Sequence, residues 1–230
     1  FTNVNISEIK EERGMKKVVF CDVKNKSKRK TLKAEGLFIA TGRKPNTEGL
    51  NVEAADVKKG KRGNIEVNNS LQTSNPNIYA IGDVNGKSMF AHAAKRELKI
   101  ALDNVLHKAN KKMNYDNMPW AVFTNPTVAG VGLSEKSARE KKLPIGILKA
   151  PFTKAGRARI INDTNGFVKV IYNKKNKRIL GCVIIGPNAD DLIHEFVAVM
   201  NSTSPTIGTI QKTIHIHPTI SEVMESLDEE

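Results

Sequence analysis

The side chain best suited to proton transfer is the imidazole of His217, which lies five residues before Glu222 in the segment HIHPTISE at 215–222. Pro218 favours the first turn of a helix, so the pattern predicts that His217 lies just outside a helix and Glu222 about one turn inside it. A carboxylate at this spacing can orient an imidazole and raise its basicity, as a general base requires. A His-Pro turn with a purely structural role is the alternative that this segment leaves open.

His215 and His217 could instead share one face of a strand and ligate a metal ion. A zinc site needs at least three protein ligands, and no third ligand is evident beside them. Cys21 and Cys182 lie far apart in apolar, strand-like runs, without a CxxC or CxxxxC partner. We therefore expect no metal site and two buried, reduced thiols, a pattern typical of cytoplasmic proteins.

A second candidate site begins at Asp83, after Gly82 and the apolar run 78–81. An acidic residue at the carboxyl end of a buried strand can accept hydrogen bonds from sugar-like hydroxyls. The start of a predicted helix follows, and its first N–H groups favour anionic or electron-rich atoms. The residues at this helix start are Met89, Phe90, Ala91 and His92. A plain turn without a ligand is the alternative.

A third candidate is Gly42 in the segment ATGRKPN at 40–46, where a predicted strand ends in small residues. Glycine has no side chain, so its backbone can approach a planar or phosphorylated ligand closely. An ordinary exit from a strand into a turn explains the same pattern.

The elements that position these residues follow from the spacing of apolar residues. Two strands are predicted at 17–23 and 33–39, a short strand at 78–81 and a helix at 91–108. The polar stretch 108–118 suggests a domain boundary near residue 113. The pattern beyond it is α+β, with strands expected at 120–123, 127–133, 145–152, 167–172 and 178–185, and helices at 135–142, 190–200, 206–213 and 219–227.

The charge and hydrophobicity of the chain limit the kinds of partner that it could bind. The chain has 230 residues, a net charge of +13 and 39% hydrophobic residues. Residues 1–112 carry 23 Lys and Arg against 12 Asp and Glu, but the densest cluster, at 24–33, has no aromatic residue on which a base could stack. We interpret it as a solvated hairpin tip. The longest apolar run, 179–185, is far shorter than the roughly 18 residues of a membrane span, so we expect neither a nucleic-acid nor a membrane partner.

Six segments, in this order, resemble the carboxyl-terminal half of the class I FAD-dependent pyridine nucleotide–disulfide oxidoreductases. The dihydrolipoamide dehydrogenase branch is the nearest match. Each segment is a weak indication alone, and their order and spacing carry the resemblance. The segments are ATGRKPN at 40–46, NIYAIGDV at 77–84, MFAH at 89–92, FTNPTVAGVGLSE at 123–135, NDTNGFVKV with ILGCVIIGPNADDLIHE within 162–195, and HIHPTISE at 215–222.

The resemblance implies an α/β tail of the NAD- and FAD-binding domains, followed by an α+β dimerisation (interface) domain with an antiparallel sheet and flanking helices. Residues 1–43 would be the carboxyl-terminal part of the NAD-binding domain. Residues 44–112 would be the returning part of the FAD-binding domain, and residues 113–230 the interface domain of a homodimer.

The resemblance also implies roles for the candidate residues. Asp83 would contact the ribityl or phosphate region of FAD, and Gly42 would lie close to the nicotinamide nucleotide of NAD. His217, oriented by Glu222, would be the catalytic base and would reach the flavin and redox disulfide of the other subunit. The residues along the isoalloxazine ring would be Met89, Phe90, Ala91 and His92.

The implied reaction is the oxidation of a small dithiol such as dihydrolipoamide. The dithiol attacks a redox disulfide while His217 takes a proton, and electrons pass through FAD to NAD. The chain opens on Phe1 and contains neither GxGxxG nor CxxxxC, so we expect a fragment or processed chain that is inactive alone and binds neither cofactor tightly.

Three alternatives stay open at this point. Mercuric reductases are expected to carry a cysteine pair near the carboxyl end, which this chain lacks. Glutathione-type reductases share the His-Pro-Thr and the following Glu. A non-catalytic dimerisation or docking module would also account for the interface-domain resemblance.

Overall fold

The computed structural model describes residues 1–229, which form two compact units, Phe1–Lys44 and Pro45–Glu230. The first unit is a three-stranded antiparallel sheet in the order β1-β2-β3, built from β1 (Val4–Glu12), β2 (Met15–Asp22) and β3 (Arg29–Ala34). Strand β2 supplies the buried side chains of this unit, Val19, Phe20 and Cys21. The lysine-rich segment lies in the β2–β3 connection and in β3, which confirms the predicted hairpin.

The strand predicted at 33–39 is wrong beyond its first residues. The pairing of β3 with β2 ends at Ala34 opposite Lys16, one residue from the start of β2. The chain beyond Ala34 therefore runs past the end of its partner strand and has no backbone groups to pair with. Phe38 and Ile39 are accordingly exposed and lie outside any strand.

The second unit begins with irregular structure around the helix α1 (Ala91–His107). The 3-10 helices η1 (Val52–Ala55) and η2 (Gly82–Asn85) precede it. Helix α1 confirms the prediction for 91–108. The strand predicted at 78–81 is reduced to one bridge between Tyr79 and Gln72, because the turn around Pro76 brings only a short stretch of backbone alongside it.

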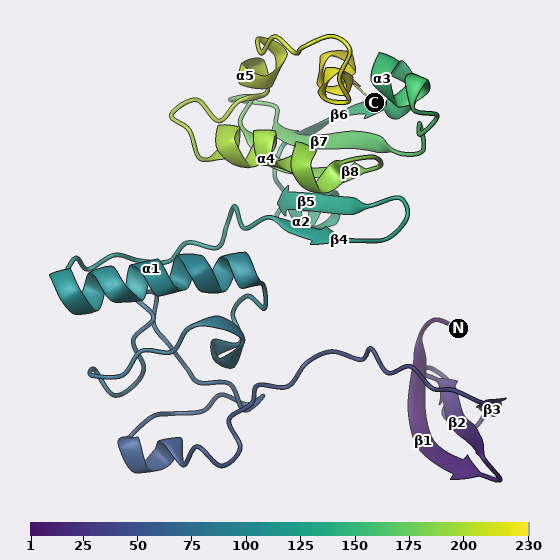
Figure 1. Ribbon diagram of the computed structural model, residues 1–230, viewed down its shortest axis with the longest axis vertical. Helices are drawn as coiled ribbons and strands as arrows, with labels where there is room; N and C mark the ends of the chain where they lie inside the picture. Colours follow the sequence, from purple (N-terminus) through teal and green to yellow (C-terminus); the bar gives the residue numbers. More distant parts are fainter. Residues whose placement is uncertain (230) are drawn as a thin grey trace. The chain divides into compact units, whose positions relative to one another are not determined.

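The rest of this unit contains a six-stranded antiparallel sheet in the order β4-β5-β8-β7-β6-β9, as predicted for the interface domain (Figure 1). The strands are β4 (Trp120–Val122), β5 (Val128–Gly132), β6 (Ile145–Pro151), β7 (Phe167–Asn173), β8 (Ile179–Ile185) and β9 (Asp228–Glu229). The helices are α2 (Glu135–Glu140), η3 (Phe152–Lys154), α3 (Gly156–Ile160), α4 (Ala189–Met200), α5 (Ile207–Gln211) and η4 (Ser221–Ser226).

The core lies between one face of this sheet and α4, which packs on β5 and β8 (Figure 1). Alternate residues of β7, including Val168 and Val170, are fully buried toward that core. Lys169, between them, points to the opposite face, where it pairs with Glu135 of α2. Helices therefore flank both faces of the sheet, and α4 and η4 hold the carboxyl-terminal segment with His217 against it.

The carboxyl-terminal segment differs from its prediction in two respects. Residues 213–220 form a loop, so His215 and His217 do not share a strand face. The helix predicted at 219–227 is the shorter 3-10 helix η4, which begins three residues after Pro218. Within residues 1–229, no helix has both the length and the apolar character needed to cross a membrane.

Candidate active site and cofactor-binding residues

The structure brings His217 and Glu222 into direct contact. The Nδ1–H of His217 donates a hydrogen bond to Oε1 of Glu222 over 2.6 Å. The imidazole is 78% exposed, whereas the Glu222 side chain is only 16% exposed. A proton on Nδ1 leaves the lone pair on Nε2, so the exposed nitrogen is the one that can accept a proton.

The backbone around Glu222 fixes its carboxylate. Oε2 of Glu222 accepts a hydrogen bond from the backbone N–H of Thr219 over 2.8 Å. The hydroxyl of Thr219 in turn donates to the carbonyl of Ile216 over 2.7 Å, which ties down the turn that carries His217. Both carboxylate oxygens are therefore used, one by the histidine and one by the turn.

The electrostatics favour a charged carboxylate beside the imidazole. The hydrogen bond from His217, followed by that from the Thr219 N–H, lowers the pKa of Glu222 below its ordinary value. An ionised Glu222 stabilises the imidazolium that forms when His217 takes a proton. The pair therefore has the geometry and charge of a general base.

His215 takes part in a second cluster that the sequence did not predict. Its Nε2 lies 3.1 Å from Oε1 of Glu195 on α4, and its Nδ1 lies 3.3 Å from Oε1 of Glu225 on η4. In the described part of the chain, no group of three or more His, Cys, Asp or Glu has the arrangement of a metal site. The local pattern gives no signal for this burial, because alternation would place Ile214 and Ile216 inside and His215 outside.

Asp83 is exposed on η2. The turn that carries it is hydrogen bonded to Glu97. Glu97 is fully buried on α1. Its Oε2 accepts hydrogen bonds from the N–H of Gly82 over 2.6 Å and from Nδ2 of Asn85 over 2.9 Å. Gly82 adopts a φ of 74°, a conformation that favours glycine. The turn that presents Asp83 is thus clamped to α1.

Tyr115 is the third hydrogen-bond donor to Glu97. Its hydroxyl donates to Oε1 of Glu97 over 2.7 Å. Burial, followed by the hydrogen bond to Glu97, raises the pKa of Tyr115 far above its ordinary value, so the hydroxyl keeps its proton and remains a donor. Glu97 therefore accepts three hydrogen bonds. The sequence alone does not reveal it, because a single Glu in a predicted helix cannot be distinguished from a charged surface residue.

Met89, Phe90, Ala91 and His92 lie at the start of α1, as predicted. Phe90 precedes the helix and provides no side-chain acceptor for its first N–H groups, while Ala91 and His92 are exposed. The rings of Phe90 and His92 stack with centroids 5.1 Å apart. Nε2–H of His92 donates to the carbonyl of Pro119 over 2.8 Å, which fixes the ring.

These features fit part of a flavin site. The exposed helix start offers N–H groups to an electron-rich carbonyl, and the clamped turn offers the Asp83 carboxylate to hydroxyl groups. The residues of this group lie on η2 and α1, whereas His217 and Glu222 lie on the loop before η4 and on η4 itself.

Gly42 lies in the first unit and is exposed. Its φ of 113° belongs to the region that favours glycine, and a Cβ built there would meet nothing within 4 Å. The backbone at Gly42 is therefore open to a ligand.

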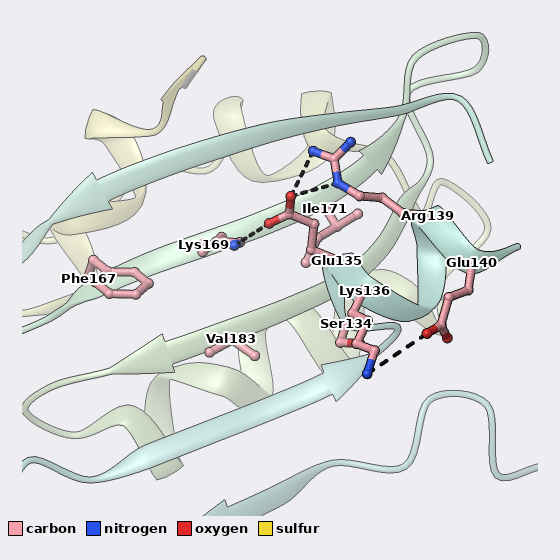
Figure 2. Close-up of a pocket in the computed structure, with 9 residues that line it drawn as sticks. All are labelled: Ser134, Glu135, Lys136, Arg139, Glu140, Phe167, Lys169, Ile171 and Val183. Atoms are coloured by element: carbon pink, nitrogen blue, oxygen red, sulfur yellow. Dashed lines mark hydrogen bonds and ion pairs between the residues drawn. The ribbon is translucent and has the colours of Figure 1, made fainter. Parts of the chain in front are cut away.

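A cavity of about 620 Å³ lies on the sheet face opposite α4, away from every predicted site residue (Figure 2). Apolar side chains of Phe167, Ile171 and Val183 form its floor, and charged residues of α2 form its rim. Lys169 and then Arg139 lower the pKa of Glu135 by direct hydrogen bonds. Glu135 thus stays ionised and paired with Lys169 and Arg139, and the cavity offers an apolar floor with a charged rim.

Comparisons with known proteins agree with the fold. Residues 118–227 match the dimerisation domain of the pyridine nucleotide-disulphide oxidoreductases, and residues 1–97 match the model for pyridine nucleotide-disulphide oxidoreductase. The HOCl-induced flavoprotein disulfide reductase RclA from Escherichia coli has a TM-score of 0.83 at 30% identity, covering 97% of this chain and 50% of that chain. LpdA from Mycobacterium tuberculosis, with a TM-score of 0.86 at 22% identity, covers 98% of this chain and 48% of that chain and supports the fold alone.

Two curated relatives give the same result at the level of sequence. Dihydrolipoyl dehydrogenase from Geobacillus stearothermophilus is 38% identical over 194 residues, which is 84% of this chain and 41% of the relative. Dihydrolipoyl dehydrogenase from Chlamydia pneumoniae is 34% identical over 223 residues, 96% of this chain and 46% of the relative. The chain spans less than half the length of these relatives. With both family models matched in order along it, the chain belongs to the pyridine nucleotide–disulphide oxidoreductase family.

Proposed function

We propose that this chain supplies the general base and the dimer interface of an FAD-dependent disulfide oxidoreductase that oxidises dihydrolipoamide with NAD. The observation that carries the proposal is the His217–Glu222 pair, with Nδ1 bonded to an ionised carboxylate over 2.6 Å and the imidazole exposed. The similarity to dihydrolipoyl dehydrogenases supports this substrate among those of the family.

In this proposal the chain's own groups handle the proton. Nε2 of His217 takes the proton of the dithiol substrate, so that its sulfur can attack a disulfide as the thiolate. Glu222 holds the ring through Nδ1 and stabilises the positive charge that the ring acquires. Thr219 keeps Glu222 in place through its backbone N–H.

The cofactor residues stay predictions of the same proposal. Asp83 would bind the ribityl or phosphate part of FAD, and Gly42 would lie beside the nicotinamide nucleotide. Met89, Phe90, Ala91 and His92 would line the isoalloxazine ring. FAD, when bound, would supply the electron transfer between the disulfide and NAD.

The proposed dimer would use residues 113–230. Phe123 is 80% exposed, and Ile214 and Ile216, on either side of His215, are 95% and 78% exposed. The two exposed isoleucines beside His217 indicate a surface that another protein surface covers. A second subunit on this surface would place His217 close to that subunit's flavin. A cytoplasmic location stays a prediction from the two free cysteines.

The proposal is tested by replacing His217 with Gln in the FAD-loaded holoenzyme that contains this chain. Positioned general bases contribute about 10²–10⁴-fold, so kcat for dihydrolipoamide oxidation should fall by at least about a hundredfold. Transfer of electrons from NADH to the bound flavin needs no base for a thiol, so its rate should change little. His107→Gln, at the exposed end of α1, is the matched control. Unchanged dithiol oxidation in the His217 variant would refute the proposal.

A further inference from the structure

The segment around His215 inverts the usual distribution of polar and apolar side chains. The imidazole of His215 is only 5% exposed, whereas its neighbours Ile214 and Ile216 are 95% and 78% exposed. Burial of a polar ring between two exposed isoleucines is unfavourable unless the ring finds bonding partners inside. The contacts of His215 must therefore account for this conformation of the loop.

Both ring nitrogens of His215 face carboxylate oxygens. Nε2 lies 3.1 Å from Glu195 and Nδ1 lies 3.3 Å from Glu225, whose Oε1 also accepts the backbone N–H of His215 over 3.3 Å. A neutral imidazole has one N–H and one lone pair, so it can donate to only one of the two carboxylates. Both contacts are favourable together only when each nitrogen carries a proton.

The charge of this cluster is set by three groups. Glu195 reaches His215 from α4, and Glu225 reaches it from η4. Cys182 on β8 is also close to Glu195, but burial and then the charge of Glu195 raise the pKa of this thiol well above its ordinary value. Cys182 thus stays neutral, and the ring of His215 faces the carboxyl groups of Glu195 and Glu225.

The two histidines contact the same short helix, η4, at two points. His215 contacts Glu225 and His217 contacts Glu222, and both acids belong to η4 (Ser221–Ser226). Only His215 also reaches α4, which is packed on the core of the sheet. His215 therefore adds a contact between this loop and α4, in addition to the packing of η4 itself on β6 and the burial of its Val223 and Met224 in the core.

We propose that His215 is a positioning residue for His217. Its ring ties the loop to α4 through Glu195 and to η4 through Glu225, and thereby holds the exposed His217–Glu222 pair in one place. The inference rests on the proposed function, because it gives His215 a role only through the base at His217.

A double-mutant cycle in the FAD-loaded holoenzyme tests this role. The variants are His215→Gln, His217→Gln and the two together, with His107→Gln as the control. Glutamine can hydrogen bond but lacks the ring whose two nitrogens face Glu195 and Glu225. We expect His215→Gln alone to lower kcat for dithiol oxidation by about tenfold and to shift its pH profile, but to lower it by less than about twofold when His217 is already replaced.

The outcomes separate the inference from the proposed function. A loss in His217→Gln together with an unchanged kcat in His215→Gln would overturn the inference alone. The same holds if His215→Gln lowers kcat by the same factor in both backgrounds, because that would indicate general damage. An unchanged kcat in His217→Gln would overturn the proposed function and the inference with it.

Glu225→Gln keeps the inference testable if His215→Gln does not fold. Glu225→Gln breaks only the contact on the exposed side. It should lower kcat by about threefold with a shifted pH profile, whereas an unchanged profile would count against the role.

Discussion

The carboxylate of Glu222 would serve both the proposed reaction and the fold. Its two oxygens are divided between the ring of His217 and the N–H of Thr219. Glutamine at this position has one acceptor oxygen and one NH₂ group, so it can keep both contacts only if His217 carries its proton on Nε2, which removes the lone pair that would accept a proton. Glu222→Gln should therefore lower kcat for dithiol oxidation by about tenfold to a hundredfold, a smaller loss than in His217→Gln. Glu140→Gln, on an exposed residue of α2, should have no effect.

The effect of Glu222→Gln on Tm should depend on pH, and the lowered pKa of Glu222 gives the direction of this dependence. Because the pKa of Glu222 is lower in the folded protein, its carboxylate contributes stability above the unfolded-state pKa, and the contribution is lost as the pH falls through the folded-state pKa. The Tm of Glu222→Gln should be below that of the unmodified protein at neutral pH and equal to it at strongly acidic pH. A difference in Tm that is the same at every pH would contradict this account.

Gly82 is required by the conformation of the turn before Asp83. Its φ is 74°, and an added Cβ would lie 3.4 Å from Cβ of Ala94. A side chain in this left-handed region costs about 1–2 kcal/mol, so Gly82→Ala should lower the free energy of unfolding by that amount in urea titrations. Gly36→Ala is the matched control, since a Cβ there meets nothing within 4 Å. Equal stabilities of the two variants would contradict the argument.

At the scale of elements, the joint between η2 and α1 depends on the buried carboxylate of Glu97. Glu97→Ala would leave the donors of Gly82, Asn85 and Tyr115 without their acceptor. Each unsatisfied buried donor costs about 1–3 kcal/mol, so the loss in unfolding free energy should be about 3 kcal/mol or more.

Glutamine at position 97 distinguishes the hydrogen bonds from the charge. Its oxygen can accept from Gly82 and Asn85, and its NH₂ can donate to the Tyr115 oxygen instead of accepting from it. Glu97→Gln should therefore lose only about 1 kcal/mol. Lys99→Ala, on the exposed side of α1, controls for changes in helix propensity. A glutamine variant as unstable as the alanine variant would show that the charge itself is needed.

The elements that the sequence predicted well are those with clear periodicity and a neighbour to pack on. Helix α1, helix α4 and strands β5 to β8 fall within about two residues of their predicted bounds. Ser134 caps α2 by accepting the N–H of Ser137. The wrong or missing predictions concern residues whose conformation depends on partners far away in the sequence. Residues 35–39 lack a partner strand, and the burial of His215 depends on Glu195, twenty residues before it.

The residues of the candidate site differ in the same way: a contact between near neighbours in the sequence could be predicted, whereas contacts between distant residues could not. The contact between His217 and Glu222 spans five residues, so local spacing was enough to predict it. Glu97 meets Gly82 and Tyr115 across 15 and 18 residues, and nothing in the local pattern marks it as buried. The structure therefore adds the residues that hold the site, whereas the sequence predicted those that would act in it.

At the scale of the whole molecule, the exposed isoleucines beside the His217–Glu222 pair predict how the chain associates. Burial of an isoleucine side chain contributes roughly 1.5–3 kcal/mol. If Ile214 and Ile216 lie in a dimer interface, replacing both with Ser should raise the dimer dissociation constant by at least about a hundredfold. Leu50→Ser is the control, since Leu50 is 58% exposed but lies outside residues 113–230.

Sedimentation at different salt concentrations then separates this interface from an electrostatic one. Contacts between apolar side chains do not depend on screening, so the dimer should persist from about 0.05 M to about 0.5 M salt. The 37 Lys and Arg of the chain allow the opposite behaviour, because binding of a polyanion to them would release counterions and weaken steeply with salt. A dimer that dissociates on adding salt, or that survives Ile214→Ser with Ile216→Ser unchanged, would place the interface elsewhere. A salt-independent dimer that those two substitutions break would put the interface beside His217, where the proposed reaction needs the second subunit.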